Sequence, residues 1–334
     1  MGETGEGGVT GEGRFPARMP LGVFMPSVLF IDAYSQIYRM FFAIRGLSDP
    51  SGAPCNAVYG MARLLQQLHE HYPTEYGALV FDKGKCSRRT ALHQLYKAQR
   101  PPMPPQLRSQ VGPIRQWAAA FGWRLVEREG VEADDLICGM THECLPCDEL
   151  ILTSDKDIAQ LTALEGVRIL SRESGRIPWS ADGADAVKRK FGVPPEQLRD
   201  YLALIGDTAD NIPGLGGCGP KTAARLLSEF GSIDGVYANL QQVRPAKLQE
   251  ALAAQRAALE RNRSLIALDQ ALPEDWCGMD GIRRKAPDWR ELKKLSEDFG
   301  FKSMAGFIAA GASASSGVSA APVAPSAPRQ LTFF

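Results

Sequence analysis

Three clusters of acidic residues are the features of this 334-residue chain that could do chemistry. They are Glu132-Ala-Asp134-Asp135, Asp155-Lys-Asp157 and Asp207-Thr-Ala-Asp210, and single aspartates, Asp32 and Asp82, end two earlier apolar runs. Carboxylates this numerous cannot crowd together ionised without counter-charge, and hard divalent cations with oxygen ligands are the natural solution. Two such ions roughly 4 Å apart make a site that hydrolyses phosphodiesters.

The positions of these acids favour one shared site over nine separate roles. Taken singly, each could be an ordinary helix N-cap or an exposed charge. However, Asp32, Asp82 and Asp155 directly or nearly follow apolar, strand-like runs. In open α/β sheets, active sites lie outside the carboxyl ends of the strands. We therefore expect one centre that holds two divalent ions, Mg²⁺ or Mn²⁺.

A basic segment lies in the first half of the chain, although the net charge of the whole is zero. From Lys83 to Val126 there is no acidic residue, and the same stretch contains nine lysines and arginines. Such a segment is either a solvated basic face or a surface over which a polyanion passes. Its place between acidic clusters favours a polyanion that approaches the metal site.

The bulk composition excludes several classes of protein. It is 44% hydrophobic and 23% charged, which is typical of a globular protein in water. No apolar run approaches the ~20 residues that span a membrane. Residues 1–20 lack the apolar core of a signal peptide, so we expect a cytoplasmic location and no membrane partner. Seven cysteines, an odd number, argue against structural disulfides.

Apolar periodicity divides the chain into five segments. Strand-like runs alternate with helical patterns up to residue 180, which predicts a mainly parallel sheet in an α/β domain. Short helical patterns follow, and an Ala-, Ser- and Pro-rich stretch precedes the last five residues. The expected segments are a disordered extension (1–26), a catalytic domain (27–180), a helical subdomain (181–309), a flexible linker (310–329) and a terminal peptide (330–334). The expected strands are at 28–31, 78–81, 124–126, 149–153 and 167–170, and the expected helices at 57–71, 113–121, 183–191, 195–205, 220–230, 246–262 and 289–299.

A glycine-rich stretch directly follows the last acidic cluster. Four glycines between residues 214 and 219 permit a tight hairpin, and Pro220 suits the first turn of the next helix. Exposed amides there can hold a phosphate, and Lys221 adds charge. Alone, the stretch would read as a turn between packed helices. Because it follows Asp207 and Asp210, we expect one unit that carries both metal ligands and a grip on a duplex.

Together these motifs resemble the 5′-nuclease (flap endonuclease) family, and within it the 5′→3′ exonuclease domain of bacterial DNA polymerase I. The resemblance implies a PIN-like α/β fold with a helical arch and a helix–hairpin–helix motif. Because the chain after residue 300 is too short for a polymerase domain, we expect a stand-alone enzyme. The motifs are Phe30-Ile-Asp32 with Tyr38-Arg39, Val80-Phe-Asp82, Tyr96-Lys97, Arg100-Pro-Pro-Met-Pro104, Gly130-Val-Glu-Ala-Asp-Asp135, Ser154-Asp-Lys-Asp157, Lys190-Phe-Gly-Val-Pro-Pro-Glu196 and Gly206-Asp-Thr-Ala-Asp-Asn-Ile-Pro-Gly214.

The resemblance also implies roles for individual residues. In the arch, Lys97 and Arg100 would share one helical face and steer the scissile phosphate, while Tyr96 would stack on the terminal base. Two turns after Asp32, Arg39 would clamp a phosphate. The first ion would be held by Asp32, Asp82, Glu132, Asp134 and Asp135, and the second by Asp155, Asp157, Asp207 and Asp210. The hairpin would bind DNA through Gly214, Gly216, Gly217, Gly219, Lys221 and Thr222, with K⁺ as a candidate ion there.

Three functions remain open at this point. The first is a monomeric 5′-nuclease that cuts DNA at a 5′ flap, nick or 5′ end and removes RNA primers. A PIN-type ribonuclease would share the acidic site but would normally lack the glycine-rich hairpin. A non-catalytic DNA-binding protein would have no reason to keep all nine carboxylates.

The last five residues resemble the short peptide with which bacterial replication and repair proteins bind the sliding clamp. That pattern requires Gln, then Leu, then two apolar or aromatic residues at the end. Free apolar ends are otherwise avoided in proteins. The alternative is that the tip folds back onto the nuclease body. The expected clamp-binding residues are Gln330, Leu331, Phe333 and Phe334.

Overall fold

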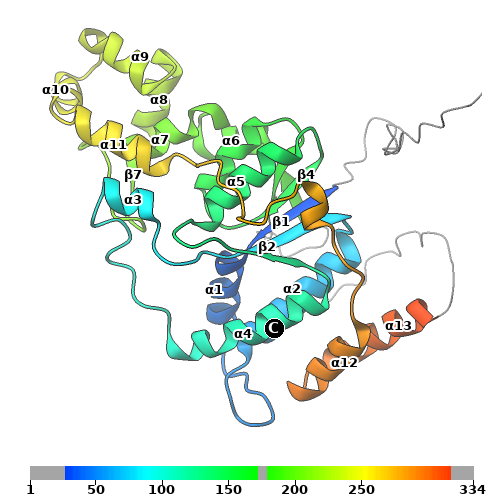
Figure 1. Ribbon diagram of the computed structural model, residues 1–334. Coiled ribbons are helices and arrows are strands. Elements are labelled where there is room, and N and C mark those ends of the chain that lie inside the picture. The colour runs from blue at the N-terminus through cyan, green and yellow to red at the C-terminus, as the bar shows by residue number, and fades with distance from the viewer. Residues whose placement is uncertain (1–26, 172–178, 317–334) are drawn as a thin grey trace, which may run out of the picture.

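A six-stranded sheet forms the centre of the computed structural model, which describes residues 27–171 and 179–316 (Figure 1). Its strand order is β3-β2-β1-β4-β5-β6, and all neighbours pair in parallel except β6, which runs antiparallel to β5 at one edge. The five expected strands are confirmed, and β6 is additional. The strands are β1 (Val28–Asp32), β2 (Tyr76–Val80), β3 (Arg124–Val126), β4 (Glu149–Leu152), β5 (Val167–Ser171) and β6 (Ser180–Asp182).

Helices cover both faces of this sheet, which explains why its central strands are continuous apolar runs. In β1, Leu29 and Ile31 face the layer of α1 (Ala33–Ala43), α2 (Asn56–His71) and α4 (Pro105–Ala120). The alternate residues Val28 and Phe30 face α5 (Ala133–Cys144) and the 3-10 helix η1 (Asp157–Ala163) on the other side. The α/β class expected from the sequence is confirmed.

Helix α4 begins eight residues earlier than expected. The sequence suggests a start at Pro113, whereas Pro105 occupies the first turn and Pro113 lies inside the helix. Packing explains the difference, because Leu107, Ile114 and Trp117 are all fully buried in the core beside α2. Burial of that apolar face outweighs the cost of one interior proline.

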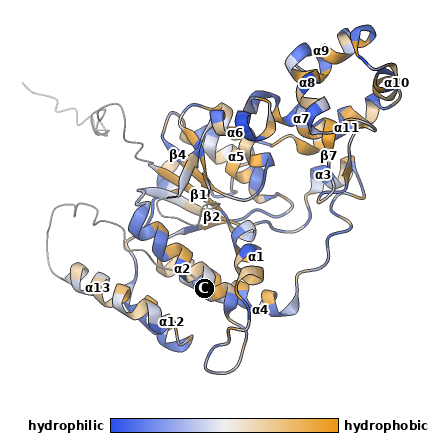
Figure 2. Cartoon of the chain, turned by 180° about the vertical axis from the view of Figure 1, so that it is seen from behind, coloured by the Kyte–Doolittle hydropathy of each residue, from blue (hydrophilic) through white to orange (hydrophobic). Residues whose placement is uncertain are grey.

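A second core forms the helical subdomain, drawn at the upper left of Figure 1. In Figure 2 its helices carry hydrophobic and hydrophilic residues side by side, as amphipathic helices do. Between α7 and α8 a two-stranded hairpin is formed by β7 (Gly206–Asp207) and β8 (Ile212–Pro213). The helices are α6 (Ala184–Phe191), α7 (Leu198–Ile205), α8 (Pro220–Phe230), α9 (Ile233–Ala238), α10 (Ala246–Ala254) and α11 (Arg256–Ile266).

The boundaries expected for this subdomain, 181–309, are wrong at the C-terminal end. After α11 the chain returns to the sheet, where Leu272 and Ile282 join the core under α5. Helices α12 (Trp289–Asp298) and α13 (Ala305–Ser316) then pack on the opposite core through Leu292 and Ile308. Apolar residues at helical spacing needed a surface to bury, and the face of α2 and α4 supplies it.

The linker expected at 310–329 also begins later than the composition suggests. Helix α13 continues to Ser316, and a Cβ on Gly311 would approach the Trp289 ring to 2.2 Å. Alanine favours helix, so the small residues extend α13 instead of ending it. The remaining linker residues, like the extension at 1–26, lie outside the described residues. Within the described ranges, no helix combines the length and the hydropathy needed to cross a bilayer.

Glu149 is a buried acid at the start of β4, fully enclosed in the structure. Its Oε1 accepts a 2.6 Å hydrogen bond from the Thr141 hydroxyl, and within the described residues Oε2 has no partner. Burial raises the pKa of Glu149 from 4.5 to about 8, against the lowering effect of the Thr141 hydrogen bond. The folded protein therefore keeps a proton that the unfolded chain releases near pH 4.5.

We predict that this proton makes the protein less stable as the pH rises. Between about pH 4.5 and 8 the free energy of unfolding falls by roughly 1.4 kcal/mol per pH unit through Glu149. Glu149→Gln keeps an acceptor for Thr141 and removes the ionisation, so it should unfold at a higher temperature than the wild type at pH 8.5. Thermal unfolding from pH 5 to 8.5 measures this, with the exposed Glu143→Gln as the matched control. Parallel curves for all three proteins would contradict the assignment.

Candidate active site

The acidic residues meet at the carboxyl edge of the parallel strands. Asp32 ends β1 and accepts a 3.2 Å hydrogen bond from the Ser35 amide, so it also caps α1. Two residues after β2, Asp82 accepts a 2.7 Å hydrogen bond from the Ala133 amide at the start of α5. Since neighbouring parallel strands end at the same edge, the topology alone brings these two acids together.

Asp32 shows how crowded the negative charge is at this edge. Burial, and after it the charges of Asp82 and Asp155, raise the pKa of Asp32 to about 7. The hydrogen bonds from the Ser35 amide and the Thr153 hydroxyl oppose this effect only partly. Three carboxylates that raise each other's affinity for positive charge fit a divalent cation well.

A second group of acids converges from η1 and the β7–β8 hairpin. Asp157, Asp207 and Asp210 each offer a carboxylate oxygen, and these oxygens all lie within 4.8 Å of one another. Burial raises the pKa of Asp157 well above its usual range, and the charges of its acidic neighbours add to the effect. Lys156 compensates one member, since its Nζ lies 3.1 Å from Asp207 Oδ2. An all-oxygen donor set of this kind suits Mg²⁺ or Mn²⁺.

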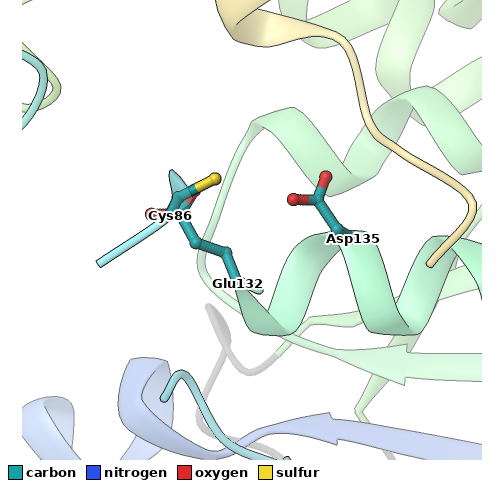
Figure 3. A group of neighbouring side chains, drawn as sticks. All are labelled: Cys86, Glu132 and Asp135. Atoms are coloured by element: carbon teal, nitrogen blue, oxygen red, sulfur yellow. The ribbon is translucent and has the colours of Figure 1, made fainter. Parts of the chain in front are cut away.

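The third group of acids already contains a cation. Oxygens of Glu132 and Asp135 lie within 4.8 Å of each other and of the Cys86 sulfur (Figure 3). The guanidinium of Arg89, which the sequence analysis did not single out, bonds all three side chains and lies near Asp134. These acids therefore have an internal cation as a partner, and their role as ligands of the first ion stays a prediction. The one feature of the sequence that could have pointed to Arg89 is its position in the basic segment.

The expected arch is mostly non-helical. Between β2 and α4 the structure has one short helix, α3 (Ser87–Leu92), followed by turns in which Lys97 has a positive φ of 53°. Lys97 and Arg100 thus do not share a helical face. They converge by another route, because the Lys97 amide donates to the Asp210 carbonyl at 3.1 Å and fixes the turn against the hairpin.

The side chains of this turn lie inside the acidic site. Lys97 Nζ is 2.5 Å from Glu132 Oε1, and Arg100 pairs with Asp210. The Tyr96 hydroxyl lies 3.0 Å from Glu132 Oε2 and 3.1 Å from Asp210 Oδ2. Tyr96 is half-buried with its hydroxyl between two acids, so it bridges Glu132 and Asp210 instead of presenting a free stacking face.

Arg39 stands apart from these contacts. It is exposed on α1, and with the residues that the structure describes it forms no hydrogen bond or ion pair. The same helix instead presents a pair of stacked aromatic rings to which the sequence analysis gave no role. Tyr38 and Phe42 stack with ring centres 6.3 Å apart, and Phe42 is 63% exposed. Their spacing of four residues was the available signal.

The expected hairpin between two helices is made by β7 and β8, and the glycine-rich stretch forms the turn that leads from β8 into α8. Gly216, Gly217, Gly219 and Lys221 are exposed around the start of α8, while Thr222 is half-buried. Gly214 has a different role, since a Cβ there would lie 2.3 Å from the Ile205 carbonyl oxygen. Four glycines in one motif therefore divide into one that permits close packing and three that expose backbone at a helix N-terminus.

We predict that Gly214→Ala destabilises the protein by more than about 2 kcal/mol, because the added methyl overlaps backbone atoms that cannot move aside. Gly219→Ala is the matched control, since a Cβ at Gly219 meets nothing within 4 Å. Urea unfolding followed by circular dichroism measures both. Equal stability of the two variants would show that the hairpin is looser than the structure indicates.

The chain is similar to known proteins over most of its length. Residues 27–192 match a family model described as "5'-3' exonuclease, N-terminal resolvase-like domain", and 193–289 match "5'-3' exonuclease, C-terminal SAM fold". A 5'-3' exonuclease of Aquifex aeolicus is 33% identical over 282 residues, 84% of this chain and 94% of that protein. A thermostable DNA polymerase I of Thermus thermophilus is 36% identical over 86% of this chain but only 34% of its own length.

Solved structures share the fold at lower identity. The T5 5'-exonuclease with bound zinc has a TM-score of 0.61 at 21% identity, covering 81% of this chain and 98% of that one. The catalytic core of Rad2 in complex with DNA substrate has a TM-score of 0.56 at 16% identity, covering 83% of this chain and 89% of that one. By its two family domains and its identity to curated relatives, this chain belongs to the 5′-3′ exonuclease family.

Proposed function

We propose that this 5′-3′ exonuclease hydrolyses phosphodiester bonds at DNA 5′ ends and flaps with divalent metal ions held by its acidic clusters. The observation that carries the proposal is the convergence of Asp157, Asp207 and Asp210 within 4.8 Å at the edge where the strands end. Charge this concentrated is stable only with cations. Among the described residues, the cations that pair with this group are Lys156, Lys97 and Arg100, all partly exposed. The similar T5 5'-exonuclease binds zinc and the similar Rad2 core is in complex with a DNA substrate, which supports the same chemistry here.

The acidic and basic side chains of the site would have different roles in cleavage. Asp157, Asp207 and Asp210 would hold one ion, and the acids around Asp32 and Asp82 the other. Bound divalent ions supply an activated water and stabilise the charge that builds on the phosphate. Lys97 and Arg100, now paired with Glu132 and Asp210, would neutralise and orient the scissile phosphate.

Substrate grip comes from elements on either side of this centre. The exposed backbone of the hairpin, with Lys221 beside it, suits a duplex phosphate. The stacked Tyr38 and Phe42 on α1 suit unpaired bases. A duplex held at the hairpin and unpaired bases held at α1 would place a junction over the acids, as primer removal and repair in the bacterial cytoplasm require.

A cleavage assay tests this function. We expect a 5′-flap duplex to be cut faster than blunt, nicked or single-stranded DNA, with Mg²⁺ or Mn²⁺ required and EDTA abolishing turnover. Asp157→Asn should lower the single-turnover rate by on the order of 10² or more, because it removes a charged ligand. The exposed Asp185→Asn on α6 is the matched control and should cleave normally. Full activity in EDTA, or an unimpaired Asp157→Asn variant, would contradict the proposal.

The terminal peptide, Gln330 to Phe334, lies outside the described residues, so its role as a ligand of a bacterial sliding clamp stays a prediction from the sequence. We expect a synthetic peptide of residues 326–334 to bind the clamp. In the full chain, Phe333→Ala/Phe334→Ala should abolish clamp binding and leave cleavage of free DNA unchanged. Fluorescence anisotropy measures the first, and the flap assay the second. Clamp binding that survives the double substitution would rule the motif out.

A further inference from the structure

Arg89 is a charged side chain in the interior, 1% exposed, at the point where three parts of the chain meet. It lies on α3 and reaches both the acids at the start of α5 and the carbonyls at the C-terminal end of α11. Nε donates to the Leu265 carbonyl at 2.9 Å, and Nη2 donates to the Ala267 carbonyl at 3.1 Å. Its nitrogens thus all have acceptors, which buried arginine requires.

The acids contacted by Arg89 differ in how many of their oxygens accept hydrogen bonds from buried groups. Both oxygens of Asp135 bond the guanidinium, Oδ2 to Nη1 at 2.7 Å and Oδ1 to Nη2 at 2.8 Å. Asp135 Oδ1 also accepts the Asp269 amide at 2.8 Å, and the residue is only 2% exposed. This is a bidentate arginine–carboxylate pair, and both Asp135 oxygens accept hydrogen bonds from buried groups of the protein.

Asp134 is held more loosely by the same guanidinium. Its oxygens lie 3.4 Å from Nη1 and 3.3 Å from Nη2, and it is half-buried. Glu132 is shared between Arg89 and the more exposed Lys97. Glu132 also accepts from Tyr96, and Asp134 Oδ1 accepts the Asp135 amide. An ion could still replace Lys97 at Glu132, because Lys97 is partly exposed, and could approach the loosely held Asp134. Both oxygens of Asp135, in contrast, are bonded to the fully enclosed Arg89.

We propose that Asp135 is a positioning residue and not a metal ligand, and that Arg89 is a permanent internal cation that sets Glu132 and Asp134 at the edge of the active site. The proposal rests on the metal-dependent function above. Asp135 is then not one of the nine expected metal ligands, and Arg89 joins the residues that shape the active site. Arg89 acts through the acids it orients and not by touching the phosphate, since it is enclosed on all sides.

The alternative is that Arg89 fills a metal position and leaves when an ion arrives. Its burial argues against this, because the bonds to the Leu265 and Ala267 carbonyls would be broken along with those to the acids. Lys97 and Arg100 are different: their side chains are 24% and 49% exposed, so water can replace the contacts they give up. Exchange with incoming ions or phosphate is therefore expected at those two cations and not at Arg89.

Manganese binding separates the two possibilities. The number of Mn²⁺ ions bound per chain and their Kd are measured by electron paramagnetic resonance of free Mn²⁺, and Tm is measured in EDTA. We expect two ions in the wild type and two in Asp135→Asn, with Kd within about 3-fold and Tm lowered by roughly 5 °C or more. Asp157→Asn should lose one ion with no fall in Tm, because it removes a carboxylate from a repelling group.

Variants of Arg89 test the positioning role separately, including the case in which Asp135→Asn does not fold. Arg89→Gln should cleave at least about 10-fold more slowly than the wild type at saturating Mn²⁺ and well below its Tm. Arg89→Lys should cleave faster than Arg89→Gln but more slowly than the wild type, because lysine restores the positive charge without the bidentate guanidinium. A purely structural role would leave the rate unchanged in molecules that remain folded.

Three results would overturn the inference. Loss of an ion in Asp135→Asn, as in Asp157→Asn, would make Asp135 a ligand. A third ion, or more than about 10-fold tighter Mn²⁺ binding in Arg89→Gln, would show that Arg89 blocks a metal position. An unchanged cleavage rate in folded Arg89→Gln would remove its positioning role. A wild type that binds no Mn²⁺ would instead refute the metal-dependent function itself.

Discussion

The concentration of carboxylates at one edge of a parallel sheet is the constraint on which the rest of this structure depends. Neighbouring parallel strands end together, so acids placed after them meet whether or not their repulsion is compensated. Burial makes the repulsion stronger, as the raised pKa of Asp32, about 7, shows. Cations must therefore be built into the fold, and the segment between β2 and α4 supplies them. Its turns are shaped by where the acids lie more than by local helix propensity.

These internal cations are of two kinds, and the difference has a functional consequence. Arg89 is enclosed and bonded to backbone as well as to acids, so its charge is part of the architecture. Lys97 and Arg100 are partly reached by solvent: Lys97 pairs with Glu132, and Arg100 pairs with Asp210 and donates to the Ala209 carbonyl. A divalent ion arriving at those acids and a phosphate arriving at Lys97 would leave every charge compensated. Such an exchange of partners would replace each pair of charges by another pair.

The sequence revealed the parts of this arrangement that follow from strand order, and it missed those that follow from packing. Acids after apolar runs predicted that the carboxylates meet at one edge of the sheet, because the carboxyl ends of parallel strands have a fixed place. The boundary at 309 failed because Leu292 and Ile308 bury on a surface that lies about 200 residues earlier in the chain, which periodicity cannot reveal. Arg89 was one of nine basic residues in its segment, and only the fold distinguishes a buried arginine from an exposed one.

The return of the chain to the sheet after α11 explains how a site divided between two cores can be precise. Asp207 and Asp210 lie on the helical subdomain, whereas Asp32 and Glu132 belong to the sheet. An insertion joined at one end would move relative to the sheet. Here its far end is fastened at the site itself, since Asp135 accepts the Asp269 amide just after α11. The same bond network holds Arg89, so the compensation of charge and the alignment of the two halves are one interaction. Loss of either partner would disturb both.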